Sequence, residues 1–297
     1  MTSPRFLDPA VLARIGNLEL VARTVVDGFI SGLHRSSYLG RSVDFAEHRP
    51  YMPGDDIRRI DWRVFGRSDR FYVKEFEADT NANFTIVLDA SRSMAYGSQG
   101  ITKLDYARFM AASLAWFARR QRDRVGLVTF DQEIISAIPP SGAHLDAVLH
   151  ALDTMQPGGV GTFEAPLERI AESLRRGSLV LVISDLLGET EGVLRGVGRL
   201  GGGGNDVIVF HVIDPAERAF PFLDPADFED LESGERLPVI PQELATEYRS
   251  RIERHLAVIE DGMLARRIDY ARFSTDRPLD FALFEFLTRR QQLSRVR

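Results

Sequence analysis

The sequence predicts an α/β fold: a smaller N-terminal α+β segment, then a doubly wound, mostly parallel sheet with one antiparallel edge strand. Three observations predict this class. The apolar runs at residues 84–89 and 179–185 show no polar alternation, as in strands buried on both faces. From residue 84 onward, strand patterns alternate with helix patterns. Each apolar run also ends in an aspartate, at the strand end where open α/β sheets bind ligands.

Residues 1–80 are expected to form the first unit, with an N-terminal helix and a charged, aromatic segment that contains short strands. Apolar side chains recur at helical spacing between residues 9 and 33, which predicts an amphipathic helix. Residues 35–77 are dense in Arg, Gly and aromatic residues, with a strand pattern at 71–76. Acidic residues nearly balance the arginines there, which favours ion pairing over phosphate binding. Trp62 is interpreted as an interdomain anchor that stacks with arginine.

Residues 81–297 are expected to form the second unit, which contains the alternating elements. Only two residues separate the strand patterns at 124–130 and 133–138, so these form a hairpin and one of them runs antiparallel. The other expected strands and helices lie at residues 84–89, 103–121, 143–153, 164–176, 179–185, 189–200 and 207–212.

The last third of the chain begins with an insertion at residues 216–240 that is rich in proline and acidic residues. We expect it to form a small hairpin with a turn at Ser233 and Gly234. A helix at 241–266, a short strand at 270–273 and a helix at 279–291 are expected to complete the unit.

Composition restricts the classes of function. The formal net charge of −6 gives no reason to expect nucleic acid or an anionic membrane as a partner. The chain has no cysteine, which excludes disulfides and thiol catalysis and fits a reducing compartment. The N-terminus lacks the apolar stretch of a signal peptide, and no apolar run approaches the roughly 20 residues that span a bilayer. We therefore expect a cytoplasmic protein without membrane insertion.

Oxygen-bearing side chains gather in three loops that we expect at the carboxyl edge of the sheet. Asp89, Ser91 and Ser93 follow the first strand, Thr162 ends a glycine-rich loop before a helix, and Asp185 follows the strand at 179–184. Oxygen ligands without His or Cys select a hard cation, which predicts Mg²⁺, with Mn²⁺ or Ca²⁺ as alternatives. Each residue alone also has a structural interpretation, as a turn former or a helix cap. Asp131 is a weaker candidate for the rim, since a hairpin turn also explains it.

Other motifs do not support a function in their context. The glycine pattern at residues 196–201 ends a helix and precedes a strand, whereas a dinucleotide fingerprint requires the reverse order. No phosphate-binding loop with Gly-Lys-Ser/Thr occurs, and the six histidines show no zinc spacing. His211 lies inside a strand pattern and is interpreted as a core or edge residue.

The motif Asp89-Ala-Ser91-Arg-Ser93, with the later Thr162 and Asp185, resembles the metal-ion-dependent adhesion site of von Willebrand factor A domains. Upstream, Tyr51-Met-Pro-Gly-Asp-Asp-Ile-Arg-Arg-Ile-Asp-Trp-Arg and Val73-Lys-Glu-Phe-Glu resemble the bacterial domain-of-unknown-function family 58, whose members commonly accompany MoxR-type AAA+ ATPases. The resemblance implies three direct metal ligands, Ser91, Ser93 and Thr162, and two acids that bind directly or through water. Phe163-Glu164 departs from the small acidic motif that often follows the threonine in relatives.

These observations predict a non-enzymatic, metal-ion-dependent protein-binding module. The resemblance implies a chaperone or adaptor that acts with a MoxR-type AAA+ ATPase, and the metal would take a carboxylate from the partner protein. Two alternatives are a metal-dependent phosphohydrolase, which would need acid/base and phosphate-neutralising groups beside the metal, and a scaffold whose metal site is inactive.

Overall fold

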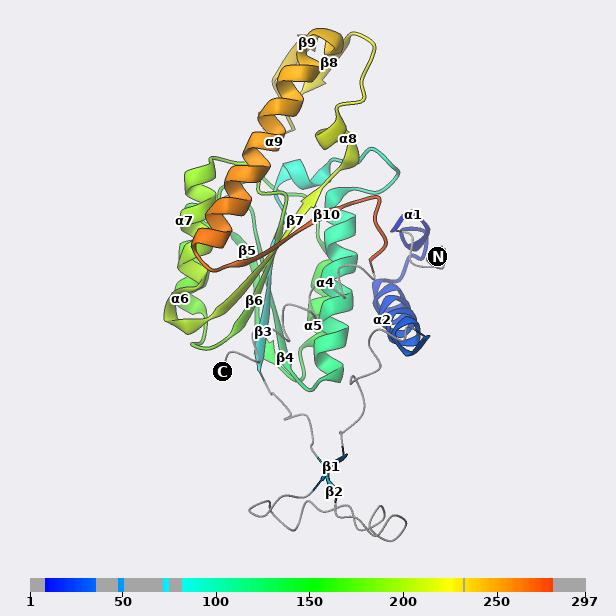
Figure 1. Cartoon of the computed structure of the whole chain (residues 1–297), viewed down its shortest axis with the longest axis vertical. Coiled ribbons are helices and arrows are strands. Elements are labelled where there is room, and N and C mark those ends of the chain that lie inside the picture. Colours follow the sequence, from blue (N-terminus) through cyan, green and yellow to red (C-terminus); the bar gives the residue numbers. More distant parts are fainter. Residues whose placement is uncertain (1–8, 36–47, 51–71, 75–81, 232, 280–297) are drawn as a thin grey trace.

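The computed structural model describes residues 9–35, 48–50, 72–74, 82–231 and 233–279. Its central feature is a six-stranded sheet in the order β10-β7-β6-β3-β4-β5 (Figure 1). Neighbouring strands are parallel except for β4 and the edge strand β5, which are antiparallel. The predicted fold class is therefore confirmed. The six strands are β3 (Asn83–Asp89), β4 (Arg124–Phe130), β5 (Ile134–Ser141), β6 (Leu179–Ser184), β7 (Asp206–Ile213) and β10 (Asp269–Ser274).

Helices cover both faces of the sheet, which explains why its central strands lack polar alternation. On β3, Phe84, Ile86 and Leu88 join the core under one set of helices, whereas Val87 joins the core on the opposite face. The first face is covered by α4 (Lys103–Arg120) and α5 (Leu145–Thr154), and α2 (Leu18–Arg35) packs against α4 (Figure 1). The second is covered by α6 (Glu164–Ser173), α7 (Thr190–Leu200) and α9 (Pro241–Ala265).

The structure corrects the helix predicted at residues 9–33. It is divided into α1 (Pro9–Leu12) and α2, with a break that contains Gly16 and Asn17. The Asn17 side-chain oxygen accepts a hydrogen bond from the backbone N–H of Leu20 at 2.9 Å, so it caps the start of α2. Buried Val21, Val25 and Val26 then pack α2 into the core.

Part of the first unit is described. A short strand β1 (His48–Pro50) pairs antiparallel with β2 (Tyr72–Lys74), which lies within the strand predicted at 71–76. Trp62 and residues 280–291 of the helix predicted at 279–291 lie outside the described residues. His211 is a core residue, because it is buried in β7 and its Nδ1 lies 2.7 Å from the Tyr270 hydroxyl.

The insertion at 216–240 forms a projection beyond the edge of the sheet. After the short helix α8 (Pro215–Ala219), β8 (Ala226–Glu229) and β9 (Arg236–Val239) form an antiparallel hairpin beside the first turns of α9 (Figure 1). Gly234 supplies the left-handed backbone of the turn, with φ of 73°. No helix among the described residues has both the length and the apolar character needed to cross a bilayer.

Candidate metal centre

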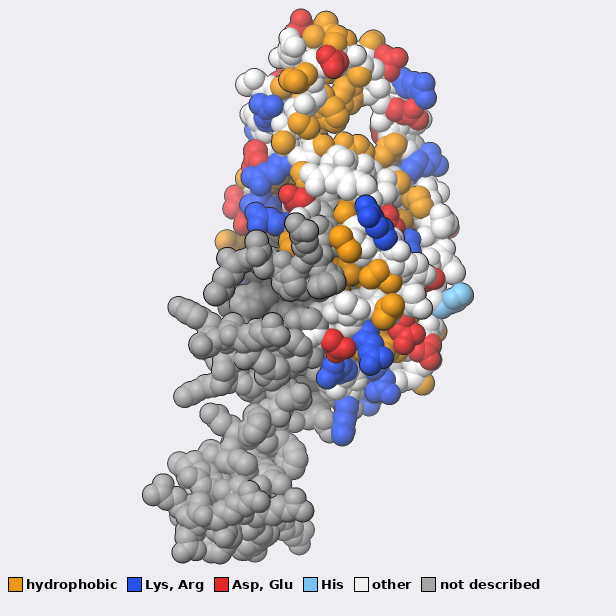
Figure 2. Space-filling model, turned by 90° about the vertical axis from the view of Figure 1, so that its right-hand side faces the viewer, with side chains coloured by type: hydrophobic (Ala, Val, Ile, Leu, Met, Phe, Trp, Pro, Cys, Tyr) orange, Lys and Arg blue, Asp and Glu red, His pale blue; other side chains and the backbone are white. Residues whose placement is uncertain are grey.

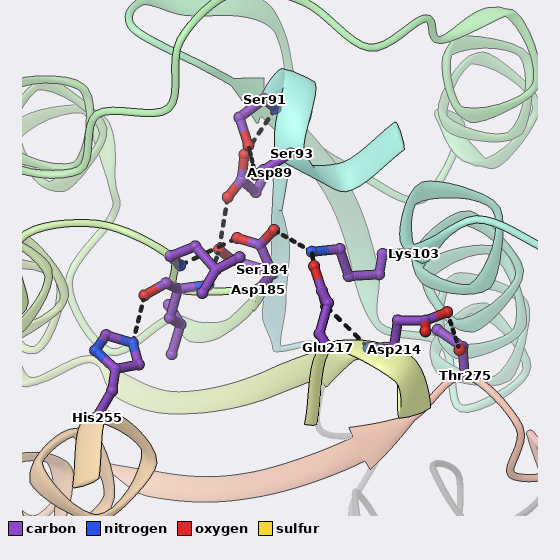
Figure 3. Close-up of polar contacts among 12 residues, drawn as sticks. Asp89, Ser91, Ser93, Lys103, Ser184, Asp185, Asp214, Glu217, His255 and Thr275 are labelled. Carbon is purple, nitrogen blue, oxygen red and sulfur yellow. Dashed lines mark hydrogen bonds and ion pairs between the residues drawn. The ribbon is translucent and has the colours of Figure 1, made fainter. Parts of the chain in front are cut away.

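The first loop of the candidate site follows β3 and is held by the Asp89 carboxylate. Asp89 is fully buried, and its Oδ1 accepts a hydrogen bond from the Ser91 backbone N–H at 2.8 Å (Figure 3). This contact turns the chain into the 3-10 helix η3 (Arg92–Ala95), which presents Ser93. The Ser91 and Ser93 hydroxyl oxygens then lie 3.1 Å apart. Two hydroxyls therefore stand beside the end of the strand, as the motif predicted.

The second loop with an acid follows β6, the neighbour of β3. Parallel pairing places the end of β6 next to the end of β3, and the Ser184 hydroxyl donates to Asp89 Oδ2 at 2.6 Å. Asp185 is also buried, and its Oδ1 accepts from the Leu187 backbone N–H at 3.1 Å. Leu186 between them has a left-handed backbone, with φ of 50°, which is a strained conformation for leucine. Asp185 and Asp89 are thereby brought to the same edge of the sheet.

Lys103, the first residue of α4, is the cation of this site. Its side chain is fully buried, and Nζ donates to Asp185 Oδ2 at 2.7 Å and to Glu217 Oε1 at 2.5 Å (Figure 3). Thr102 positions it by starting α4 with a capping box shared with Asp105. Glu217 lies on α8, so the Lys103 ammonium links the second acidic loop to the base of the projection.

Sequence patterns did not identify Lys103 or Glu217 as site residues. They are separated from each other by 114 residues, and Lys103 is 82 residues from Asp185. A fully buried lysine almost always has an acidic partner, so the burial of Lys103 would have pointed to such a partner. Lys103 lies at the start of an amphipathic helix, where its burial could not be known before the helix was placed on the sheet.

The glycine-rich loop is tied to the first loop by its backbone. The Gly158 N–H donates to the Ala90 carbonyl at 2.6 Å, and the Arg92 N–H donates to the Gly159 carbonyl at 2.9 Å. Asp131 also anchors this loop, because its Oδ2 accepts a hydrogen bond from the Gly159 N–H at 2.7 Å. Its Oδ1 accepts from the Glu133 N–H at 3.0 Å, so Asp131 is also the hairpin-turn residue that the sequence indicated.

Thr162 is the predicted ligand that the structure does not join to the others. It lies in the same loop as Gly158 and Gly159 but is exposed to solvent. Within the described part of the chain, its hydroxyl makes no hydrogen bond to Asp89, Ser91, Ser93 or Asp185. The structure thus brings four of the five predicted residues together, with the loop of the fifth anchored beside them.

The two buried aspartates have opposite electrostatic environments. Burial, together with the nearby Asp185 charge, raises the pKa of Asp89 to about 7, although hydrogen bonds from Ser184 and Ser91 lower it in part. Burial also acts to raise the pKa of Asp185, but the Lys103 charge and hydrogen bonds from Lys103, Leu187 and Ser93 outweigh this effect and lower it. Asp89 therefore lacks the compensating cation that Asp185 has.

This environment fits a hard cation. Among the described residues no Lys, Arg or His forms an ion pair with Asp89, so a bound cation would supply the missing positive charge. The Ser91 and Ser93 hydroxyls offer the neutral oxygen ligands beside it. Within the same part of the chain, no three His, Cys, Asp or Glu side chains are grouped to hold a metal, so the candidate centre depends on its hydroxyls.

Comparisons with known proteins agree with the upstream motif. A model of the family described as protein of unknown function DUF58 matches residues 47–259. Uncharacterized protein Rv1480 of Mycobacterium tuberculosis (strain ATCC 25618 / H37Rv) is 28% identical over 234 residues, which cover 76% of this chain and 73% of that protein. Uncharacterized protein Mb1516 of Mycobacterium bovis matches to the same extent, with 28% identity over 234 residues.

Solved structures with a similar course of the chain include BatB from Bacteroides thetaiotaomicron, with 17% identity and a TM-score of 0.49 over 70% of this chain and 98% of that one. An aerotolerance-related membrane protein from Bacteroides fragilis has 19% identity and a TM-score of 0.45, over 64% of this chain and 90% of that chain. The SpRpn10 VWA domain has 12% identity and a TM-score of 0.39, over 67% of this chain and 92% of that chain.

Proposed function

The chain belongs to the DUF58 family, and from that premise we propose that it is a cytoplasmic, metal-ion-dependent protein-binding module. It acts as a chaperone or adaptor with a MoxR-type AAA+ ATPase and has no catalytic activity of its own. The observation that carries the proposal is the buried Asp89 carboxylate, which has two hydroxyls beside it and no cationic partner among the described residues.

The hydroxyls and the acids of the site would contribute to Mg²⁺ binding in different ways. Ser91 and Ser93 provide inner oxygen ligands, and Thr162 is assigned the same role by the family resemblance. Both Asp89 oxygens already accept hydrogen bonds from the protein, which leaves their remaining lone pairs for water molecules around the ion. Asp185 is bound to Lys103 and supports the site in the same indirect way. Bound Mg²⁺ would supply a Lewis-acidic position that accepts a carboxylate from the partner protein.

The acids and Lys103 also set the net charge around the ion. The Lys103 ammonium compensates Asp185, so Asp89 remains as the acid that balances the metal charge. A divalent ion with one uncompensated acid retains a positive charge. This favours an anionic ligand from outside and explains why a partner carboxylate, rather than a neutral group, would complete the site.

The phosphohydrolase alternative is less well supported by the geometry. Lys103 is buried and bound to two acids, so it is not free to neutralise a phosphate. His255 lies near the second loop, but its Nε2 donates to the Leu186 carbonyl at 3.2 Å (Figure 3). His211 is buried and holds Tyr270. These groups maintain the fold of the loops, and none is placed as a general acid or base.

Binding of the purified MoxR-type ATPase from the same genome tests the proposal. The wild type and the Ser93→Ala variant would be titrated with the ATPase in Mg²⁺ and in EDTA. We expect binding of the wild type in Mg²⁺ only, with affinity reduced about tenfold or more in Ser93→Ala. Ser173→Ala is the matched control, because its hydroxyl bonds only the carbonyl of Ile170 at the end of α6. Equal binding in Mg²⁺ and EDTA would favour the scaffold with an inactive site, and phosphatase turnover that requires Ser93 would favour the enzyme.

A further inference from the structure

The projection next to the candidate metal centre has a composition unlike the rest of the molecule. We call it the arm and define it as residues 215–248, which contain α8, the β8–β9 hairpin and the start of α9. Figure 1 shows that the arm extends beyond the sheet, and Figure 2 shows hydrophobic side chains gathered over this end. None of these residues belongs to the metal centre except Glu217 at its base.

An aromatic cluster connects the parts of the arm. The Phe220 ring is stacked on Phe228 at 5.6 Å between centroids and lies 4.5 Å from the Tyr248 ring of α9. Phe222 contacts both phenylalanines edge-on, at 5.2 and 5.1 Å. Arg249 of α9 connects this helix to the end of α8, because its Nε donates a hydrogen bond to the Ala219 carbonyl at 2.7 Å. The hairpin, α8 and the start of α9 therefore pack together through their own side chains.

Large apolar side chains remain exposed around this aromatic cluster. Leu223 is 71% exposed and Leu237 is 59% exposed, and Ile240 and Leu244 are also exposed at the start of α9. Leu237 is opposite Phe228 in the hairpin, so it lies on the ribbon face that carries the aromatic cluster. Soluble proteins rarely leave such a group of apolar side chains uncovered unless it binds something.

The charge around this apolar group is strongly negative. Residues 215–248 contain nine Asp and Glu and two basic residues, Arg218, which forms a salt bridge to Glu253 at 2.8 Å, and Arg236. Arg236 is itself occupied by a salt bridge to Glu229, at 2.7 Å. An apolar centre surrounded by charge of one sign is the arrangement of a protein interface, in which the centre supplies affinity and the charges supply orientation and partner choice.

We propose that the arm is a docking surface for a partner protein whose complementary site is an apolar pocket rimmed by lysine and arginine. This goes beyond the proposed function, because the contact uses residues outside the metal centre and does not need the metal. A second copy of this chain is a poorer occupant, since two arms in a symmetric contact would bring acidic rims together. Nucleic acid and anionic lipid are disfavoured for the same electrostatic reason.

Site-specific photo-cross-linking in the cells that make this protein tests the proposal. The photoreactive residue p-benzoylphenylalanine would replace Leu223 or Leu237 in the full chain. The matched control is the same replacement at Leu264, which is 74% exposed at the far end of α9. We expect a cross-linked protein from the two arm positions that is absent from the control position. Its absence, a cross-link to nucleic acid, or a product consisting of two copies of this chain would overturn the proposal.

The captured protein would then be purified and titrated with the wild type, the Leu223→Ser/Leu237→Ser double variant and Leu264→Ser. Support requires binding that weakens about tenfold or more in the double variant, weakens at high salt, and persists both in EDTA and in the Leu264→Ser control. Unchanged affinity of the double variant, or affinity that does not depend on salt, would refute the proposal. Loss of binding in EDTA would assign the contact to the metal centre instead of the arm.

Discussion

Replacing Asp89 by asparagine is expected to stabilise the metal-free protein at pH 8. The pKa of this buried carboxyl rises from an ordinary 3.8 to about 7, so the folded protein holds a proton there that the unfolded chain releases near pH 4. The free energy of unfolding therefore decreases as the pH rises from about 4 to about 7. Above pH 7 the loss of unfolding free energy caused by the ionised Asp89 is complete. At about 1.4 kcal/mol per pH unit, the difference corresponds to about 4 kcal/mol.

Asparagine removes the charge and keeps most of the local contacts. Its side-chain oxygen can still accept from the Ser91 N–H, whereas the hydrogen bond with Ser184 must rearrange at a cost of about 1 kcal/mol. The net gain at pH 8 is then about 3 kcal/mol, and it should fall below about 1 kcal/mol at pH 5, where the folded protein keeps the proton on Asp89 and only the unfolded chain has released it. Chemical denaturation of the wild type and Asp89→Asn in EDTA, at pH 8 and at pH 5, measures this difference in the free energy of unfolding.

Asp185→Asn is the matched control, because it removes the other buried carboxylate of the site with the opposite expected sign. Lys103 lowers the pKa of Asp185, so loss of this charge leaves the buried ammonium with Glu217 alone and should destabilise the protein by about 3 kcal/mol at pH 8. Addition of Mg²⁺ should stabilise the wild type more than Asp89→Asn. A destabilised Asp89→Asn protein at pH 8, or a gain that persists unchanged at pH 5, would refute the electrostatic reasoning.

Three further outcomes are expected. Lys103→Met should lower the free energy of unfolding by about 3–5 kcal/mol in urea titrations, because it leaves the buried Asp185 and the partly buried Glu217 without a cation, and a loss below about 1 kcal/mol would contradict this. Gly158→Ala should weaken Mg²⁺ binding about tenfold in calorimetric titration, because the new Cβ collides with Asp131, while Gly142→Ala in open space should bind like the wild type. Burial lowers the pKa of His211 to about 3, so below pH 6.5 the unfolded chain binds a proton that the folded protein does not. Relative to His211→Gln, the wild type should therefore lose about 1.4 kcal/mol of stability per pH unit below pH 6.5, and equal pH profiles of the two proteins would argue against a neutral buried histidine.

The elements that the sequence predicted well are those specified by contacts near in the chain. The runs that became β3 and β6 are apolar throughout, and this pattern alone places them in the middle of a covered parallel sheet. The two-residue separation between the strand patterns at 124–130 and 133–138 requires a hairpin, which became the antiparallel pair of β4 and β5. The failure at residues 9–33 has a local cause too, since the capping side chain of Asn17 restarts the helix where the apolar spacing continues without interruption.

The geometry of the candidate site could be predicted from the sequence only in its first loop, where the contacts join residues that are near in the chain. Asp89, Ser91 and Ser93 are neighbours in the chain, and the hydrogen bond from the Ser91 N–H to Asp89 needs no distant residue. By contrast, Thr162 and Asp185 were selected only because their loops were expected at the same edge of the sheet, and of the two the structure joins Asp185 to the first loop.

The sequence by itself determined the fold class, the edge of the sheet where oxygen ligands gather, and the family. Only the tertiary structure decided the charge of the site, because it buries Lys103 between Asp185 and Glu217 and leaves Asp89 without a counter-ion among the described residues. It also decided which leucines of the arm remain exposed. The physical reason is the same in both cases: secondary structure depends on short-range periodicity, whereas desolvation and charge pairing depend on residues that only folding brings together.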